Sequence, residues 1–183
     1  MAARARVLSQ PGVDRLRQWV AQPGQSDFAQ QPAAQRAAIL YAAAQASQQL
    51  RDNAGAHAFW RQLDALVPAS DAAARRQSAW LGAELALAAG QPQQALDLVE
   101  RHPAPQLRPA VLLHAQAQLA LQRPALASER LQTWVTTHPQ DAQAWQWLAQ
   151  AWQAQNQPLR ALRAQAEAQV AIRDFSAAQD RLK

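Results

Sequence analysis

The sequence has no cysteine and very little glycine, and these two absences remove several classes of site. Among its 183 residues there are 0 Cys, 5 Gly and 1 Tyr. Without cysteine the chain forms neither a disulfide scaffold nor a zinc or iron–sulfur site built on thiolates. So few glycines leave little room for a phosphate-binding loop, and the G-x-S-x-G, Walker and G-x-G-x-x-G motifs are all missing.

Long apolar runs are missing as well. No stretch approaches the roughly 18 consecutive apolar residues that a transmembrane helix needs, so we expect no transmembrane segment. Residues 1–10 are too few and too polar for a signal peptide. We therefore expect a chain that is made in the cytoplasm or excised from a longer protein.

Alanine and glutamine dominate what is present. The sequence holds 46 Ala and 30 Gln, while β-branched residues are scarce. Alanine, leucine, glutamine and arginine lose little on entering a helix, whereas sheets favour β-branched and aromatic residues. The composition therefore predicts an all-α fold.

The basic residues are not gathered into one patch. The net charge is +5, and Arg75-Arg76 is the only adjacent basic pair. Proteins that bind nucleic acid usually cluster their arginines and lysines in a stripe. We therefore expect no nucleic-acid partner.

Similar turns recur along the chain at nearly constant spacing. Pro92, Pro124 and Pro158 each open an apolar helical pattern, and they are separated by 32 and then 34 residues. Proline is favoured in the first turn of a helix, where its missing N–H is no loss. An earlier turn, at residues 51–56, has capping residues in place of proline, and its Ala56 lies 39 residues before Ala95.

A period near 34 with two helices per unit is typical of tetratricopeptide (TPR) repeats. In each TPR unit the two helices cross closely, which requires a small residue on each helix. Because a quarter of the chain is alanine, the spacing of the turns is better evidence for the repeat than the presence of small residues. The register places alanine at both positions in all four units, as the pairs Ala44 and Ala56, Ala83 and Ala95, Ala115 and Ala127, and Ala149 and Ala161.

The pattern predicts a TPR-like right-handed superhelix of antiparallel helix pairs. We expect a helix and linker at residues 1–31, then about four repeats and a C-terminal helix at 32–183, with residues 22–31 as the linker. No strand is predicted. The expected helices span residues 10–21, 32–50, 54–66, 71–89, 92–101, 107–121, 124–137, 141–155, 158–172 and 175–182.

Tryptophans mark one face of the helix expected at 141–155. Trp145, Leu148, Ala149 and Trp152 recur at helical spacing, which predicts a core face rather than a ligand platform. Trp147 lies off this face, and we expect it to contact a partner or a neighbouring helix.

Catalytic and metal-binding patterns are missing. The four histidines, His57, His102, His114 and His138, are far apart, and no HExxH motif brings two imidazoles to one zinc ion. We expect no catalytic residue, no metal, no cofactor and no enzymatic activity in this chain. His138, at a helix end, is expected to cap that end.

The first helices of such repeats line the usual binding surface. At the groove positions the chain lacks the Lys, Arg and Asn of carboxylate-clamp TPRs. Amides would instead bond the backbone of a peptide partner, and Tyr41, Trp80, Leu112 and Leu119 would receive its apolar side chains. The alternative is that glutamine stands at these positions only because it is common throughout the chain. The predicted peptide-binding residues are Tyr41, Gln45, Gln48, Trp80, Glu84, Leu112, Gln116, Leu119, Gln146 and Gln150.

Several short motifs occur in a suggestive order. They are ARVL at 5–8 with PGV at 11–13, RPAVLL at 108–113, HP at 138–139 with Asp141 and Trp145, QPLRALRA at 157–164, AEA at 166–168 and DF at 174–175. Together they resemble the C-terminal TPR part of bacterial periplasmic zinc metalloproteases of the β-barrel assembly-enhancing type. The resemblance covers nearly the whole chain and is strongest over 108–182.

The resemblance implies a non-catalytic arm in the periplasm, separated from an HExxH peptidase domain. Such an arm would dock on the outer-membrane assembly machinery or present misassembled β-barrel proteins to its own peptidase domain. Because HExxH is missing here, no catalytic residue of the family transfers to this sequence. The alternative is a structural or regulatory solenoid that self-associates or covers its own peptidase domain.

Overall fold

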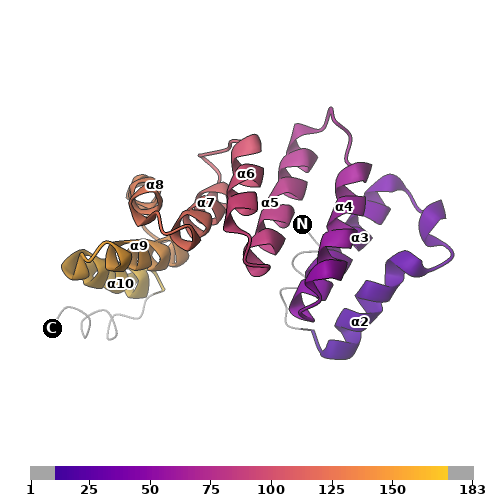
Figure 1. Cartoon of the computed structure of the whole chain (residues 1–183), viewed down its shortest axis with the longest axis horizontal. Helices are drawn as coiled ribbons and strands as arrows, with labels where there is room; N and C mark the ends of the chain where they lie inside the picture. The colour runs from indigo at the N-terminus through magenta and orange to yellow at the C-terminus, as the bar shows by residue number, and fades with distance from the viewer. Residues whose placement is uncertain (1–10, 173–183) are drawn as a thin grey trace. The chain divides into compact units, whose positions relative to one another are not determined.

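The computed structural model describes residues 11–172 (Figure 1). Within that range the chain forms nine α-helices and two short 3-10 turns and contains no strand, which confirms the all-α prediction. From the second helix onward, every predicted helix end lies within one residue of the observed end. The helix predicted at 175–182 lies outside the described residues.

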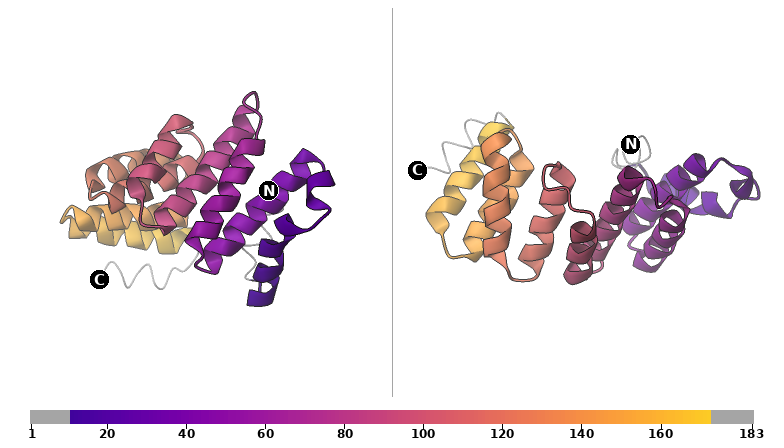
Figure 2. Two further views of the ribbon diagram at one scale, coloured as in Figure 1. Left: turned by 45° about the vertical axis from the view of Figure 1, so that its right-hand side comes forward. Right: turned by 90° about the horizontal axis from the view of Figure 1, so that it is seen from above.

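The helices fall into two compact units, the first ending at Gln91 and the second beginning at Pro92. Within each unit neighbouring helices pack consecutively, as in an all-α repeat solenoid (Figure 2). None of the described helices is both long and apolar enough to cross a membrane. The first unit contains α2 (Val13–Ala21), α3 (Ala33–Gln49), α4 (Asn53–Leu66) and α5 (Ala72–Ala88), and the second contains α6 (Pro92–Arg101), α7 (Arg108–Ala120), α8 (Pro124–Thr137), α9 (Ala142–Ala154) and α10 (Pro158–Ala171).

The segment predicted to be a linker folds into two 3-10 turns, η1 (Gln22–Gly24) and η2 (Phe28–Gln30). Phe28 packs against the hydrophobic core of the first unit, and α2 packs against α3. The N-terminal helix is therefore part of the first compact unit.

The same backbone turn ends α3, α5, α7 and α9. In each turn one residue adopts a left-handed conformation, and the next N–H donates to a carbonyl of the last helical turn over 2.8–2.9 Å. This is the Schellman arrangement, which satisfies carbonyls that the helix leaves free. The left-handed residues are Arg51 (φ 62°), Gly90 (φ 72°), Gln122 (φ 58°) and Asn156 (φ 56°).

These four left-handed residues are spaced by 39, 32 and 34 residues, the same intervals that the sequence repeat predicts. Glycine and asparagine tolerate this conformation, whereas arginine and glutamine adopt it at a cost. The turns are therefore equivalent in backbone although they differ in sequence.

Alanines close the helix pairs that lie within one unit, as the repeat register predicts. Ala44, Ala56, Ala115 and Ala127 are at most 1% exposed, and the pairs α3–α4, α7–α8 and α9–α10 pack directly. Ala149 and Ala161 are 3% and 1% exposed in the core of the second unit, together with the predicted stripe residues Leu148 and Trp152. Trp145 packs against the same core, so the face predicted from Trp145, Leu148, Ala149 and Trp152 is core. Trp147, which the sequence places off that face, is half-buried against the same core.

In the helix pair α4–α5 a tryptophan side chain lies directly against a helix backbone. The Trp60 indole lies over Gly82, where an added Cβ would stand 2.5 Å from two ring atoms. Trp60 Nε1 donates to the Ser78 carbonyl at 2.9 Å, and Ser78 Oγ donates to Asp64 Oδ1 at 2.7 Å. The hydrogen bond from Trp60 Nε1 fixes the ring over Gly82, so position 82 requires glycine.

Asp141 joins three helices of the second unit. Its carboxylate accepts two hydrogen bonds from Arg108, at 2.7 and 2.8 Å, and one from Trp134 Nε1 at 2.9 Å. It also caps α9 by accepting from the Ala144 N–H at 3.2 Å. Burial alone would raise the pKa of Asp141, but these hydrogen bonds outweigh it and hold the pKa below its usual value.

We predict that Gln122→Gly raises the free energy of unfolding by about 1 kcal/mol, because glycine adopts the left-handed turn without steric cost. Chemical denaturation measures the change. As a matched control, Gln132→Gly on the exposed side of α8 should lower the same quantity by about 1 kcal/mol. Equal destabilisation by both variants would contradict the turn assignment.

Candidate functional site

The residues predicted to line a peptide groove are divided between the two units. In the first unit Tyr41, Gln48 and Glu84 are half-buried, whereas Gln45 and Trp80 are only 8% and 2% exposed. The structure brings two of them together, because Gln45 Nε2 lies 3.4 Å from Glu84 Oε2. Burial leaves little of Trp80 for a partner.

In the second unit the predicted residues differ in exposure. Leu112 is 5% exposed and belongs to the core, and Leu119 packs against it. Gln116 is half-buried, while Gln146 and Gln150 on α9 are exposed. The role of this face in binding stays a prediction, and in the second unit its exposed members are the two α9 amides.

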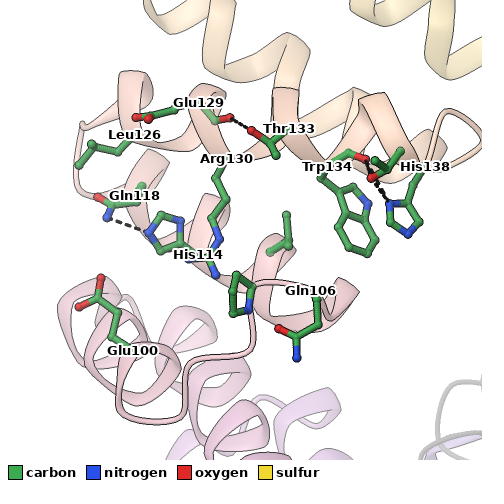
Figure 3. Close-up of a pocket in the computed structure, with 13 residues that line it drawn as sticks. Glu100, Gln106, His114, Gln118, Leu126, Glu129, Arg130, Thr133, Trp134 and His138 are labelled. Carbon is green, nitrogen blue, oxygen red and sulfur yellow. Dashed lines mark hydrogen bonds between the residues drawn. The ribbon is translucent and has the colours of Figure 1, made fainter.

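A cavity of about 780 Å³ lies in the second unit among α6, α7 and α8 (Figure 3). Apolar side chains form much of its wall: Val111 on α7, Leu126 and Trp134 on α8, and Pro105 in the loop before α7. Leu126 is 46% exposed, so part of this apolar wall faces outward. The cavity can therefore receive an apolar group from outside the chain.

Two polar side chains form the cavity floor, one turn apart on α7. His114 and Gln118 are 9% and 4% exposed, and Gln118 Nε2 lies 3.4 Å from His114 Nε2 (Figure 3). The other polar atom of each side chain, His114 Nδ1 and Gln118 Oε1, is buried without a hydrogen-bond partner. Buried polar atoms are usually paired, so two free ones in one cavity are unusual.

Burial and a neighbouring positive charge keep the imidazole neutral. Burial is the larger cause and the charge of Arg130 on α8 the smaller, and together they lower the pKa of His114 to about 4. Burial also lowers the pKa of Arg130, against the opposing effect of the Glu100 carboxylate on α6. At neutral pH the floor therefore offers an uncharged ring between a cation and an anion.

The C-terminal end of α8 forms the far rim of the cavity. The His138 ring stacks on Trp134, with centroids 3.6 Å apart and planes 6° apart. His138 Nδ1 lies 3.2 Å from the Trp134 carbonyl and 2.9 Å from Thr137 Oγ1. His138 therefore sits at the helix end, where the sequence predicts a capping role.

The arrangement is suited to hydrogen bonding and apolar contact. Over residues 11–172 no cluster of three or more His, Cys, Asp or Glu side chains is placed to hold a metal ion. The cavity combines a neutral imidazole, an amide and apolar walls that include an indole, which is the composition of a ligand pocket.

Sequence reasoning did not single out His114 with Gln118. One signal was available, because these are two polar residues one turn apart in a helix whose other residues, apart from Arg108 and Gln116, are apolar. Their burial depends on α6 and α8, which the sequence of α7 does not describe.

Comparison with protein-family models gives no match to this chain, and the curated proteins give none either.

We predict that lowering the pH destabilises the chain through His114. The pKa in the folded state, about 4, is below the ordinary 6.5, so the unfolded chain takes up the proton first. The contribution to stability is complete above about pH 6.5 and is lost as the pH falls towards 4. Denaturation at several pH values should give a smaller decrease in unfolding free energy for His114→Gln than for the wild type. Parallel pH profiles would contradict this.

Proposed function

We propose that this chain is a non-catalytic protein–protein interaction module that binds segments of polypeptide. The observation that carries the proposal is the recurrence of one left-handed turn at Arg51, Gly90, Gln122 and Asn156, together with the direct packing of the helix pairs α3–α4, α7–α8 and α9–α10. Stacked helix pairs of this kind present extended surfaces on which other chains bind.

A finer proposal follows from the motifs in the sequence. We propose that the module is the TPR arm of a periplasmic zinc metalloprotease that acts in outer-membrane protein assembly and quality control. Its support is the resemblance carried by residues 108–113, 138–145 and 157–168. On this proposal the peptidase chemistry belongs to another domain, and the arm brings polypeptide or assembly components to it.

A second candidate function is self-association, and the exposed apolar side chains of α10 favour it. Leu159, Leu162 and Val170 are 81%, 41% and 44% exposed, which is unusual for large apolar residues at one helix. On this reading the exposed side of α10 contacts a second copy or the chain's own peptidase domain. Its expected signature is a mass that rises with concentration.

Binding to defined polypeptides tests the first proposal. Fluorescence anisotropy with a purified, unfolded outer-membrane β-barrel protein should show saturable binding, because an unfolded chain offers extended segments. A folded protein of similar size is the control and should bind much more weakly. Replacing both exposed α9 amides, Gln146→Ala and Gln150→Ala, tests whether the predicted face takes part.

No binding to any unfolded polypeptide would overturn the proposal. Light scattering over a range of concentrations separates the alternatives. A rising mass without polypeptide binding would favour self-association.

A further inference from the structure

One arginine in the second unit is half-buried and unpaired. Arg130 on α8 lines the cavity among α6, α7 and α8, and its side chain extends from α8 towards α7 (Figure 3). Within residues 11–172 its guanidinium takes part in no hydrogen bond and no ion pair. Its nitrogens are not sealed off as the free atoms of His114 and Gln118 are, so a group that enters the cavity reaches them.

The carboxylates that line the cavity do not pair with this cation. Glu100 on α6 attracts the guanidinium without forming an ion pair, and the Glu129 side chain points away from it (Figure 3). Both glutamates are exposed, so water and salt screen their charges. Burial lowers the pKa of Arg130 in spite of Glu100, so the guanidinium loses more hydration than the chain replaces. A charge that is partly withdrawn from water is normally paired, and here the partner has to come from outside.

Apolar side chains flank the cation on the same face of α8. Leu126, Arg130 and Trp134 follow one another at intervals of four residues, so their Cβ atoms lie about 5–6 Å apart along the helix. All three line the cavity, and Leu126 is 46% exposed. Val111 and Pro105 add further apolar wall. A ligand bound to Arg130 therefore places its neighbouring atoms against apolar groups.

These features suit a carboxylate that is carried on the same carbon atom as an apolar side chain. A guanidinium binds a carboxylate through two parallel hydrogen bonds. The apolar groups stand within about 5–6 Å of Arg130, so the charged and apolar parts of the ligand have to be close together. The last residue of a polypeptide has both parts on one α-carbon. In an extended chain, by contrast, the side chain that follows an internal aspartate or glutamate points to the opposite face.

We propose that the cavity among α6, α7 and α8 binds the C-terminal residue of a polypeptide, with its carboxylate on Arg130 and its apolar side chain against Leu126. The inference rests on the proposed function, because it states which part of a bound polypeptide the module recognises. A cavity of about 780 Å³ also has room for residues that precede the chain end. The groove positions predicted on the first helices are not part of this site.

The test uses the full chain and three short peptides. The first is a pentapeptide of glycine and serine that ends in leucine with a free carboxylate, and its binding is followed by NMR through the methyl resonances of Leu126. Amidation of the same peptide removes the negative charge and is expected to weaken binding about tenfold, through lost hydrogen bonds to a charged group. The third peptide is also amidated but carries an aspartate directly before the leucine, and it should bind no better than the second.

Variants of the chain give the matching loss from the protein side. Arg130→Gln removes the charge and keeps a polar side chain, so it should weaken binding of the free-carboxylate peptide about tenfold and leave the amidated peptide unchanged. Arg160→Gln, at an exposed position on α10, makes the same change in net charge and should leave both affinities unchanged. Circular dichroism checks that both variants are folded. A loss confined to the free-carboxylate peptide separates direct contact from a structural role of Arg130.

The outcomes separate this inference from the proposed function. Equal binding of the free and amidated peptides overturns the inference, and so does an equal effect of Arg130→Gln and Arg160→Gln. If the aspartate peptide binds as tightly as the first, the cavity does not recognise a chain end and the inference is wrong. If unfolded polypeptide binds but no peptide shifts the Leu126 resonances, the inference fails and the proposed function stands. If no polypeptide binds at all, both fail.

Discussion

The close approach of paired helices at alanine is the constraint on which the structure depends. Ala115 on α7 and Ala127 on α8 are both 0% exposed, and larger side chains there would force the two backbones apart. The turn at Gln122 joins these helices in a fixed geometry because its hydrogen bonds satisfy the end of α7. Small contact residues and a constant turn together define the pairs α3–α4, α7–α8 and α9–α10.

The candidate site follows from that packing. Because α8 lies close on one side of α7, and α6 packs on α7 as well, His114 and Gln118 are buried between them. Burial removes water from the imidazole and keeps it neutral at physiological pH. The fold thus buries two polar side chains beside a largely apolar cavity and leaves one polar atom of each without a hydrogen-bond partner, which is costly.

The sequence predicts the helices well, because their determinants are local: prolines in the first turn, alanine-rich interiors and regularly spaced turns. It predicts the exposure of the first helices less well. Trp80 and Leu112 occupy groove positions in the repeat register but are 2% and 5% exposed, since burial depends on residues distant in sequence. The pairing of His114 with Gln118 was missed for the same reason. The left-handed turns at Arg51 and Gln122 were also missed, because neither position holds the glycine that usually marks such a turn.

The most direct test of helix pairing through small contacts is the unfolding free energy of Ala115→Leu compared with Ala120→Leu. Both lie on α7, but Ala115 is buried against α8 and Ala120 is exposed. Close pairing predicts a loss of about 2 kcal/mol for Ala115→Leu, from overpacking, and a change within about 0.5 kcal/mol for Ala120→Leu. Equal stability of the two variants would contradict it.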